Sequence, residues 1–302
     1  MSSGAAKDPY RLRCWSFAAF GTTYFQAAIL QRRAATRSIH NHPDDVTIQD
    51  EAGGTDAPSS ALPDGWCEIV GRGRMGQALA SALESAGVPV RGPLARGADS
   101  LDAAIVLLCV PDREIGTASA AVAAGPIVGH VSASAELSLL EPHERFALHP
   151  LLSVVGTGAR FAGATCAVDG STARALGEAE DLARRLGMRA CVVPADKRAL
   201  YHAAASIASN YLITLEAVAE QLAQKVGLDR AALAPLVRAT VEQWEILGAR
   251  AALTGPIARG DDATVARQRD AVAGAAPDLL PLWDALADAT RTLAATPSAS
   301  AA

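Results

Sequence analysis

A strand that runs into a glycine-rich turn and then into a helix is the feature that most constrains this chain. Residues 66–83 read W-C-E-I-V-G-R-G-R-M-G-Q-A-L-A-S-A-L. The first five residues are mostly apolar and predict a buried strand, and those after the last glycine are good helix formers. Between them, Gly71, Gly73 and Gly76 form the pattern G-x-G-x-x-G. In this context the pattern is typical of a dinucleotide site.

Each glycine has a physical role in such a turn. Gly71 permits the tight turn, Gly73 lets the backbone approach a pyrophosphate, and Gly76 lets the helix pack closely on the sheet. The free N–H groups at the helix N-terminus then hold the phosphates. Arg74 and Met75 belong to the same turn and are counted with the cofactor-binding residues. The alternative is a glycine-rich turn in some other α/β unit.

The type of cofactor depends on the residue about 20 positions further on, where an acidic side chain would bind the 2′-hydroxyl of NAD. This chain has Arg91 there, and no carboxylate lies between Glu84 and Asp99. Arg91, with Arg96, suits a 2′-phosphate, because a planar guanidinium pairs well with phosphate. The sequence therefore predicts NADP (or NADPH) rather than NAD. Two ordinary surface arginines remain the alternative.

Further apolar runs predict the rest of the first domain. They alternate with helical segments, which favours an α/β fold with a doubly wound parallel sheet, a Rossmann domain. One amphipathic helix is expected at about 171–186. The runs that predict strands are 103–112, 126–134, 145–154, 164–170 and 189–194.

Ligands bind at the carboxyl ends of the strands in such a sheet. Val110 and Pro111 follow one strand, and His130 follows the next, so we assign them to the cofactor site. His149 ends the strand after that and is a candidate catalytic residue. Each histidine alone is open to a second interpretation, a structural role in a loop.

After Pro194 the chain predicts helices only, at about 196–226, 229–248, 262–275 and 277–294. On the first of these, His202, Ser206 and Asn210 lie at i, i+4 and i+8 and therefore share a face. This stripe carries no charge, whereas exposed faces of the chain are rich in Glu and Arg. It is consistent with a pocket that faces inward, and a solvated face is the alternative.

We predict four segments: 1–64, an extension; 65–194, the Rossmann domain; 195–295, an all-α domain for substrate binding and dimerisation; and 296–302, a disordered tail. Residues 1–64 combine an acid-free, arginine-containing part with a linker-like part. Four interpretations are compatible with this composition: a disordered extension, a mis-assigned gene start, a targeting signal and a membrane anchor. An uncharged run of 17 residues in it is at the low end for a membrane span.

Composition excludes some classes of function. The net charge of −5 and the pI of about 5.7 give no basic face for nucleic acid. The five cysteines have no zinc-like spacing, so no metal site is expected, and they are typical of reduced thiols in a cytoplasmic protein. We expect no membrane partner for the folded domains.

The order of the motifs resembles the 6-phosphogluconate-dehydrogenase-like group, which includes pyrroline-5-carboxylate reductases, β-hydroxyacid dehydrogenases and deazaflavin-dependent NADP reductases. More closely, the chain is similar to a family with a Rossmann-like domain and a C-terminal domain of unknown function, whose members are predicted NADP-linked oxidoreductases. Ala133 stands where that family tends to have glycine. The matching motifs are G-R-G-R-M-G, C-V-P-D, H-V-S-A-S, L-H-P-L, Y-H-A-A-A-S-I-A-S-N and L-T-G-P-I-A-R-G-D.

The resemblance implies that the helical domain lies across the nicotinamide end of the cleft, often with a dimer partner contributing. We therefore expect a homodimer formed through this domain. The loop from Thr254 to Asp261 would fold over the cleft, with Thr254 and Arg259 binding the substrate. Asp261 has a second interpretation as the cap of the following helix.

These observations predict an NADP-dependent oxidoreductase that transfers a hydride to or from a small, anionic carbonyl or imine compound. His149 and His202 are the candidate proton donors, since an ordinary histidine pKa near 6.5 suits this role at neutral pH. Asn210 would position the substrate, and Ser206 and Arg259 would bind it. The alternatives are a non-catalytic NADP-binding regulatory or scaffold protein, and reaction with a deazaflavin.

Overall fold

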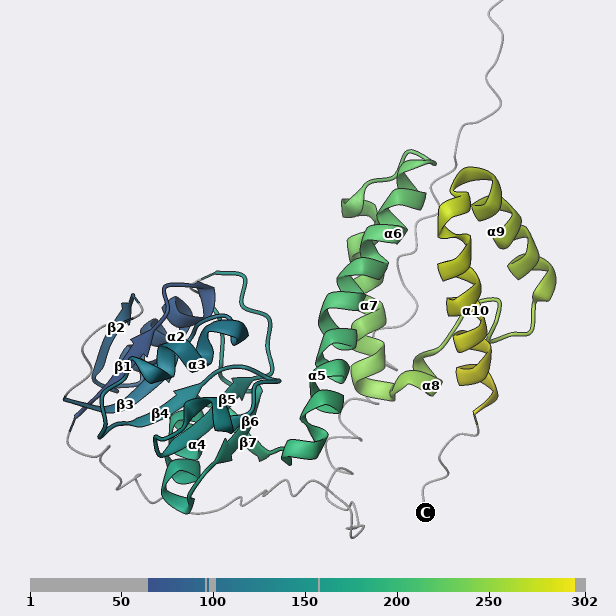
Figure 1. Cartoon of the computed structure of the whole chain (residues 1–302). Helices are drawn as coiled ribbons and strands as arrows, with labels where there is room; N and C mark the ends of the chain where they lie inside the picture. The colour runs from purple at the N-terminus through teal and green to yellow at the C-terminus, as the bar shows by residue number, and fades with distance from the viewer. Residues whose placement is uncertain (1–64, 96, 98–101, 157, 297–302) are drawn as a thin grey trace, which may run out of the picture. The chain divides into compact units, whose positions relative to one another are not determined.

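The computed structural model describes residues 65–95, 97, 102–156 and 158–296 (Figure 1). The four readings of residues 1–64, the predicted tail beyond residue 296 and the side chain of Arg96 lie outside the described residues. Within the part that is described, no helix has the length and apolarity of a membrane span.

A seven-stranded sheet forms the first half of the described chain, in the order β2-β1-β3-β4-β5-β6-β7. The strands β2, β1, β3, β4 and β5 are all parallel to one another. The predicted Rossmann-like α/β fold is therefore confirmed. The bounds are β1 (Trp66–Val70), β2 (Val90–Leu94), β3 (Ala103–Leu108), β4 (Ile127–His130), β5 (Arg145–Pro150), β6 (Thr165–Gly170) and β7 (Arg189–Val192).

The far edge of the sheet differs from the expected all-parallel arrangement. Strand β6 runs antiparallel to β5, and β7 runs parallel to β6. The segment between β5 and β6 contains no helix among its described residues. A parallel connection needs a crossover, usually a helix, so the chain reverses here instead. Helix α4 (Ala173–Arg185) provides such a crossover between β6 and β7.

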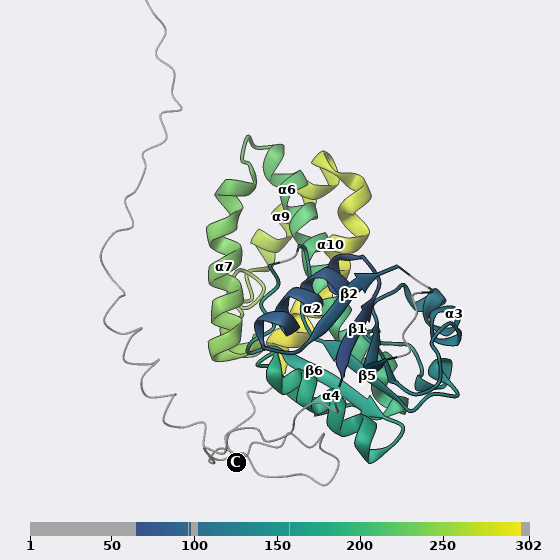
Figure 2. The ribbon, with the colours of Figure 1, turned by 90° about the vertical axis from the view of Figure 1, so that its left-hand side faces the viewer.

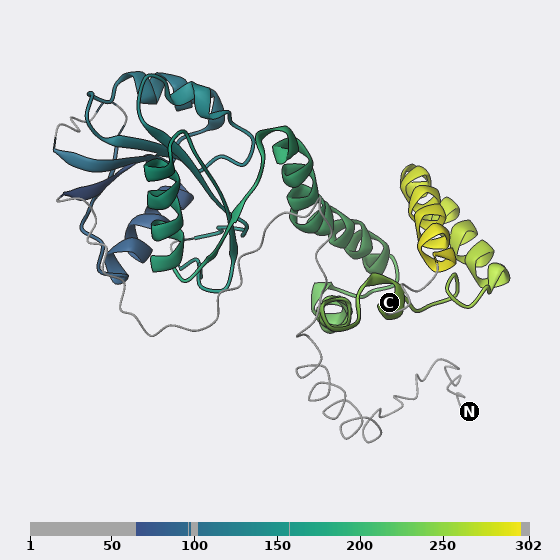
Figure 3. The ribbon, with the colours of Figure 1, turned by 90° about the horizontal axis from the view of Figure 1, so that it is seen from below.

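Helices cover both faces of the sheet (Figure 3). Along β3, Ile105 and Leu107 pack in the core shared with α2 (Arg74–Ser85) and α4. The alternate residues Val106 and Leu108 pack in a second core with α3 (Ile115–Ala120). Because side chains alternate along a strand, a continuous apolar run is what a sheet buried on both sides requires.

The second half of the described chain is helical. Helices α5 (Arg198–Ser206) and α6 (Leu212–Gln224) are joined by a π-helical turn (Ile207–Tyr211), so that they form one long helix. The π turn was not predicted from the sequence. The other helices are α7 (Arg230–Leu247), α8 (Ala249–Ala252), α9 (Asp262–Ala275) and α10 (Leu280–Ala295). Figure 2 labels α7, α9 and α10 in this helical half.

The long helices expose many apolar side chains. None of the 18 residues of α7 is buried. Leu236 and Trp244 on α7 are 67% and 57% exposed, and Ile213 on α6 is 69% exposed. The apolar side chains of these two helices are therefore largely open to solvent within the single described chain.

Candidate active site

The glycines of the turn after β1 do not all serve the same purpose. Gly71 has a φ of +121°, and a Cβ on it would lie 2.2 Å from the carbonyl oxygen of Cys109. A Cβ on Gly76 would lie 2.0 Å from the carbonyl oxygen of Gly71. These close approaches bring the turn, helix α2 and the end of β3 together, as expected of the first and third glycines of the pattern.

Gly73 is different, because a Cβ added there would meet no atom within 4 Å. Its φ of −73° and ψ of 178° are open to any residue. The fold therefore does not require glycine at this position, and the open space in front of it suits the close approach of a pyrophosphate. Gly73 is also the N-cap of α2 and has no side chain to cap the first N–H groups. The turn thus fits a dinucleotide phosphate.

Two exposed arginines flank Gly73. Arg72 precedes it and Arg74 is the first residue of α2, whereas Met75 packs against the hydrophobic core. Sequence reasoning had not singled out Arg72, although it lies inside the glycine pattern. Both guanidinium groups are carried by the turn that would hold the phosphates.

The structure does not bring Arg91 to this turn. Arg91 is opposite Glu68 in the middle of β1, and Nη1 of Arg91 lies 3.7 Å from Oε2 of Glu68. Strand β2 continues to Leu94, whose carbonyl oxygen accepts a hydrogen bond of 2.9 Å from the N–H of Gly71. The carboxyl end of β2 therefore lies beyond Arg91. The position 20 residues after Gly71 is near the start of β2 and not at the strand end where a ribose-binding residue is expected.

Polar side chains link the loops that follow β3 and β4. The hydroxyl groups of Ser132 and Ser134 donate to Oδ2 of Asp112 over 2.8 and 3.0 Å. Asp112 comes directly after Val110 and Pro111, which are half-buried and exposed at the end of β3. The network holds the two loops together beside the glycine turn.

His130 lies beneath this network rather than at the surface. Its side chain is fully buried, and its Nδ1 accepts a 3.2 Å hydrogen bond from the N–H of Ser132. Burial, together with the positive charge of Arg198, lowers the pKa of His130 to about 4. Its Nε2 has no hydrogen-bond partner among the described residues. The ring is neutral at physiological pH and does not line the pocket described next.

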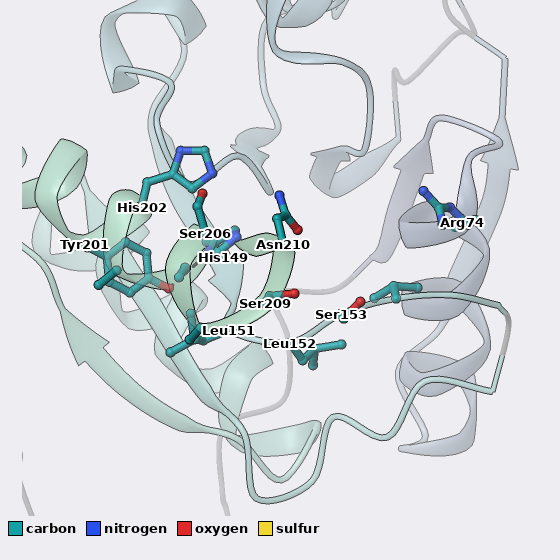
Figure 4. Close-up of a pocket in the computed structure, with 14 residues that line it drawn as sticks. Arg74, His149, Leu151, Leu152, Ser153, Tyr201, His202, Ser206, Ser209 and Asn210 are labelled. Carbon is teal, nitrogen blue, oxygen red and sulfur yellow. Dashed lines mark hydrogen bonds between the residues drawn. The ribbon is translucent and has the colours of Figure 1, made fainter. Parts of the chain in front are cut away.

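A pocket of about 730 Å³ lies at the carboxyl end of β5 and against the start of the long helix (Figure 4). It extends from Arg74 on the glycine turn to the polar stripe of the long helix, so the structure brings five of the predicted residues together: Arg74, His149, His202, Ser206 and Asn210. Sequence reasoning missed Tyr201. The polar lining includes Arg74, His149, Tyr201, His202, Ser206 and Asn210.

His149 and Tyr201 form a pair in this pocket. Nδ1 of His149 lies 2.8 Å from the hydroxyl oxygen of Tyr201. The two rings meet edge to face, with centroids 5.6 Å apart and planes at 89°. The sequence carried a signal, since Tyr201 directly precedes His202 in the motif Y-H-A-A-A-S-I-A-S-N. One aromatic residue in an apolar helix is, however, usually a packing residue.

Burial changes the proton chemistry of the pair. It lowers the pKa of His149 to about 4, with a further contribution from His202, and it raises the pKa of Tyr201 to about 12. The expectation of an ordinary pKa near 6.5 for His149 is therefore wrong, because the ring is desolvated. At neutral pH both side chains are uncharged.

Arg198 attaches the long helix to the sheet. It is buried, and its guanidinium donates to Oδ2 of Asp169 on β6 over 2.7 Å and to the carbonyl oxygen of Ala135 over 3.0 Å. These bonds fix the first turn of α5 relative to β6 and to the loop after β4. Tyr201 and His202 follow within one turn, so Arg198 sets their position at the pocket.

The π turn shapes the rest of the pocket wall. A π-helix has an i→i+5 hydrogen-bond pattern, so each turn is wider than in an α-helix. Ser209 and Asn210, both within the π turn, line the pocket together with Ser206. Turns of this kind are often found at functional sites.

The loop from Thr254 to Asp261 does not reach this pocket within its own chain. Neither Thr254 nor Arg259 is among the lining residues. Asp261 is the N-cap of α9, where its carboxylate accepts hydrogen bonds from the N–H of Thr264 over 3.0 Å and from its hydroxyl over 2.6 Å. The structure therefore shows Asp261 as the cap of the following helix.

Comparison with known proteins gives one family match, to the C-terminal part of the chain, and structural matches over most of the chain. Residues 164–290 match the family described as a domain of unknown function (DUF2520). No curated protein sequence matches the chain significantly. The structure of a candidate NADP oxidoreductase from Bacteroides fragilis is similar at a TM-score of 0.66 and 18% identity, over 77% of this chain and 100% of that one.

Two further solved structures carry a cofactor in their descriptions. A reductive aminase from Aspergillus terreus, in complex with NADPH and ethyl-5-oxohexanoate, has a TM-score of 0.54 and 17% identity, over 76% of this chain and 94% of that one. The Plasmodium falciparum pyrroline carboxylate reductase, with NADP bound, has a TM-score of 0.50 and 11% identity, over 77% and 99%. At these identities the similarity establishes the fold, and it confirms the structural resemblance noted from the motifs.

Proposed function

We propose that this chain is an NADP-dependent oxidoreductase that transfers a hydride to or from a small, anionic carbonyl or imine compound. One observation carries the proposal: a single pocket joins Arg74 on the dinucleotide turn to the His149–Tyr201 pair. The structures similar in fold include proteins described with NADP or NADPH bound, which supports the same cofactor here.

The chemistry requires a proton donor as well as a hydride. The hydride is supplied by NADPH when it is bound. Reduction of a C=O or C=N bond leaves an electron pair on the heteroatom, and a positioned donor must protonate it. His149 is the candidate donor, because its Nε2 has no hydrogen-bond partner among the described residues and its ring lines the pocket. Ser206 and Asn210 would orient the substrate beside it.

The polarity of the pocket favours an enzyme over a sensor. A protein that only reports NADP status would gain by filling this space with apolar side chains. Instead, His149, Tyr201, His202 and Asn210 line it. Convergent polar groups in a concave site are characteristic of substrate binding.

Selection of NADP over NAD would rest on the arginines of the glycine turn. Arg72 and Arg74 are exposed on either side of Gly73, whereas Arg91 pairs with Glu68. We therefore propose that Arg72 or Arg74 contributes to binding the 2′-phosphate, in place of the role first assigned to Arg91.

Thermal unfolding with NADPH, NADP, NADH or buffer alone tests the proposed cofactor. A ligand present at about 100 times its Kd adds roughly 2.7 kcal/mol to the free energy of unfolding. We expect NADPH and NADP to raise the unfolding midpoint clearly and NADH to have little effect. An equal effect of NADH would contradict the phosphate selection, and no effect of any cofactor would contradict the proposed enzyme.

We also propose that a second copy of the chain covers the exposed helices and brings its loop, Thr254 to Asp261, over the pocket. The exposed apolar residues of α6 and α7 support such a homodimer, and Arg259 would then hold the anionic group of the substrate bound by the partner copy. Arg259 is suited to this because guanidinium groups pair with carboxylates in a bidentate manner.

Mixing two inactive variants tests this arrangement. Arg259→Ala and His149→Asn should each lose activity, and mixed dimers should regain it, because one site in each then combines an intact loop with an intact histidine. Sedimentation should show a dimer in both variants. Dimers whose mixture stays inactive would place the loop over the pocket of its own chain.

A further inference from the structure

The His149 ring lacks a second proton of its own at neutral pH. With its pKa at about 4, the imidazole carries one proton, on one of its two nitrogens. If that proton went to the substrate and nothing replaced it, an imidazolate would remain, which is a very unfavourable species in a desolvated pocket. A neutral histidine can act as a proton donor only if another group supplies a proton to its other nitrogen.

Tyr201 is the group in the right place. Its hydroxyl oxygen is 2.8 Å from Nδ1 of His149, and among the described residues it has no other hydrogen-bond partner. If Nδ1 carried the proton, the tyrosine would accept the bond and its own O–H would have no acceptor among these residues. With the tyrosine donating, the O–H proton has an acceptor, and the histidine proton must be on Nε2. Each arrangement leaves one of the two protons without an acceptor among the described residues. Only the second keeps a proton on Nε2, the nitrogen that the tyrosine leaves open to a substrate, so a histidine that donates to the substrate requires the tyrosine to donate to Nδ1.

We propose that Tyr201 is a positioning residue and proton source for His149. Its hydroxyl holds the ring in the tautomer with the proton on Nε2, which is the nitrogen that the tyrosine leaves available for the substrate. This inference rests on the proposed reductase function. It also implies that the resting site is prepared for reduction, since it holds a proton to give.

The step balances as a relay of two protons. Hydride addition to carbon sends the π electrons of the C=O or C=N bond to the heteroatom. The heteroatom takes the proton from Nε2 of His149, and the Tyr201 O–H bond breaks as its proton moves to Nδ1. The tyrosinate that remains then takes a proton from solvent. The ring loses its Nδ1 proton to solvent and gains one on Nε2, which restores the first tautomer.

The direction of the relay is favourable. An alkoxide is about as basic as hydroxide and is therefore a much stronger base than a tyrosinate. Tyr201 has its pKa raised to about 12 and is still the stronger acid. The titratable groups near His149 are His202 on α5 and Asp112 after β3, and no hydrogen bond from either reaches Nδ1 in the described structure.

Nitrogen NMR of the histidine rings tests the inference in the full chain, without cofactor or substrate. The protonated and bare nitrogens of a neutral ring resonate far apart, and the signals of His149 are those lost in His149→Asn. We expect the parent to show the proton on Nε2 and a bare Nδ1. Tyr201→Phe should convert this to a mixture of both tautomers.

Tyr211→Phe is the matched control, because Tyr211 is on the same long helix but is 59% exposed and outside the pocket. It should leave the His149 tautomer unchanged, and thermal unfolding of both variants checks that they fold. A parent with the proton on Nδ1, or a tautomer unaffected by Tyr201→Phe, would overturn the inference.

Kinetics separates this inference from the proposed function. With a carbonyl or imine substrate found by screening with NADPH, Tyr201→Phe should lower kcat by about 10- to 100-fold and leave KM unchanged, since part of the general acid catalysis is lost. Equal losses in kcat for Tyr201→Phe and Tyr211→Phe would overturn the relay. If no such compound is reduced, the proposed function fails, while the NMR result still decides whether Tyr201 sets the tautomer.

Discussion

Gly73→Ala is expected to fold as stably as the parent chain and to bind NADPH about 10- to 100-fold more weakly. The added Cβ would meet no protein atom within 4 Å, and the backbone at Gly73 is in a conformation that alanine adopts freely. Replacement of glycine at such a site can even stabilise the fold by about 0.4–1 kcal/mol. The loss of affinity comes from the phosphate, since one charge-assisted hydrogen bond to it contributes about 1.5–3 kcal/mol.

Gly71→Ala supplies the contrast. Its Cβ would lie 2.2 Å from the carbonyl oxygen of Cys109, at a φ of +121°. Strain and overpacking should therefore lower the free energy of unfolding by about 2–5 kcal/mol. Chemical unfolding and NADPH titration of both variants check the pair. Unchanged affinity in a folded Gly73→Ala protein would show that the phosphates do not bind at this turn.

His149→Asn is expected to lower kcat by about 100- to 10,000-fold, the range usually lost with a general acid. The Kd for NADPH should not change, because His149 is at the other end of the pocket from Arg74 and the glycine turn. The measurement is steady-state kinetics alongside cofactor titration. In the parent chain, kcat should show no step near pH 6.5, since the pKa of His149 is about 4 and the ring stays neutral above that value.

His202→Asn is the informative comparison for that variant. The side chain of His202 is exposed on the pocket wall and makes no hydrogen bond among the described residues, whereas His149 is paired with Tyr201. We therefore expect the smaller loss of kcat from His202→Asn. A larger loss would make His202 the proton donor and reverse the roles that the geometry favours.

Local patterns made most of the fold predictable. The strand-turn-helix sequence around Gly71, the apolar run of β3 and the caps of the helices depend on residues close together in the chain. Helix α9 begins and ends where the sequence indicated, because Asp261 caps it and its periodic residues end at Ala275. The stripe of His202, Ser206 and Asn210 was visible for the same reason, and the structure places all three in one pocket.

Long-range contacts were not predictable in this way. Arg198 meets Asp169 and the carbonyl of Ala135, and Tyr201 meets His149, across 29, 63 and 52 residues. No periodicity relates such partners, and an arginine or tyrosine at the start of a helix has many ordinary roles. The lowered pKa of His149 was missed for the same reason, because burial is a property of the assembled site.

Two details of the first domain depended on connections between strands that the sequence patterns did not specify. Arg91 was placed by its distance from Gly71, but β2 runs further than expected and leaves Arg91 opposite Glu68. The direction of β6 was inferred from the general alternation of strands and helices, whereas the missing crossover after β5 reverses the chain. In both cases the actual length and content of one connection decided the geometry.

The π turn at residues 207–211 also changes the direction in which side chains point along the long helix formed by α5 and α6. An α-helix advances about 100° for each residue, so one residue accommodated in a wider turn offsets everything after it by about that angle. The faces of α6 are therefore rotated relative to the face of α5 that carries Tyr201 and His202. Deleting one residue here would convert the π turn to regular α-helix and rotate the apolar side chains of α6 about the helix axis. Chains that share the pocket but orient their helical region differently should show a one-residue gap at this place when aligned with this one.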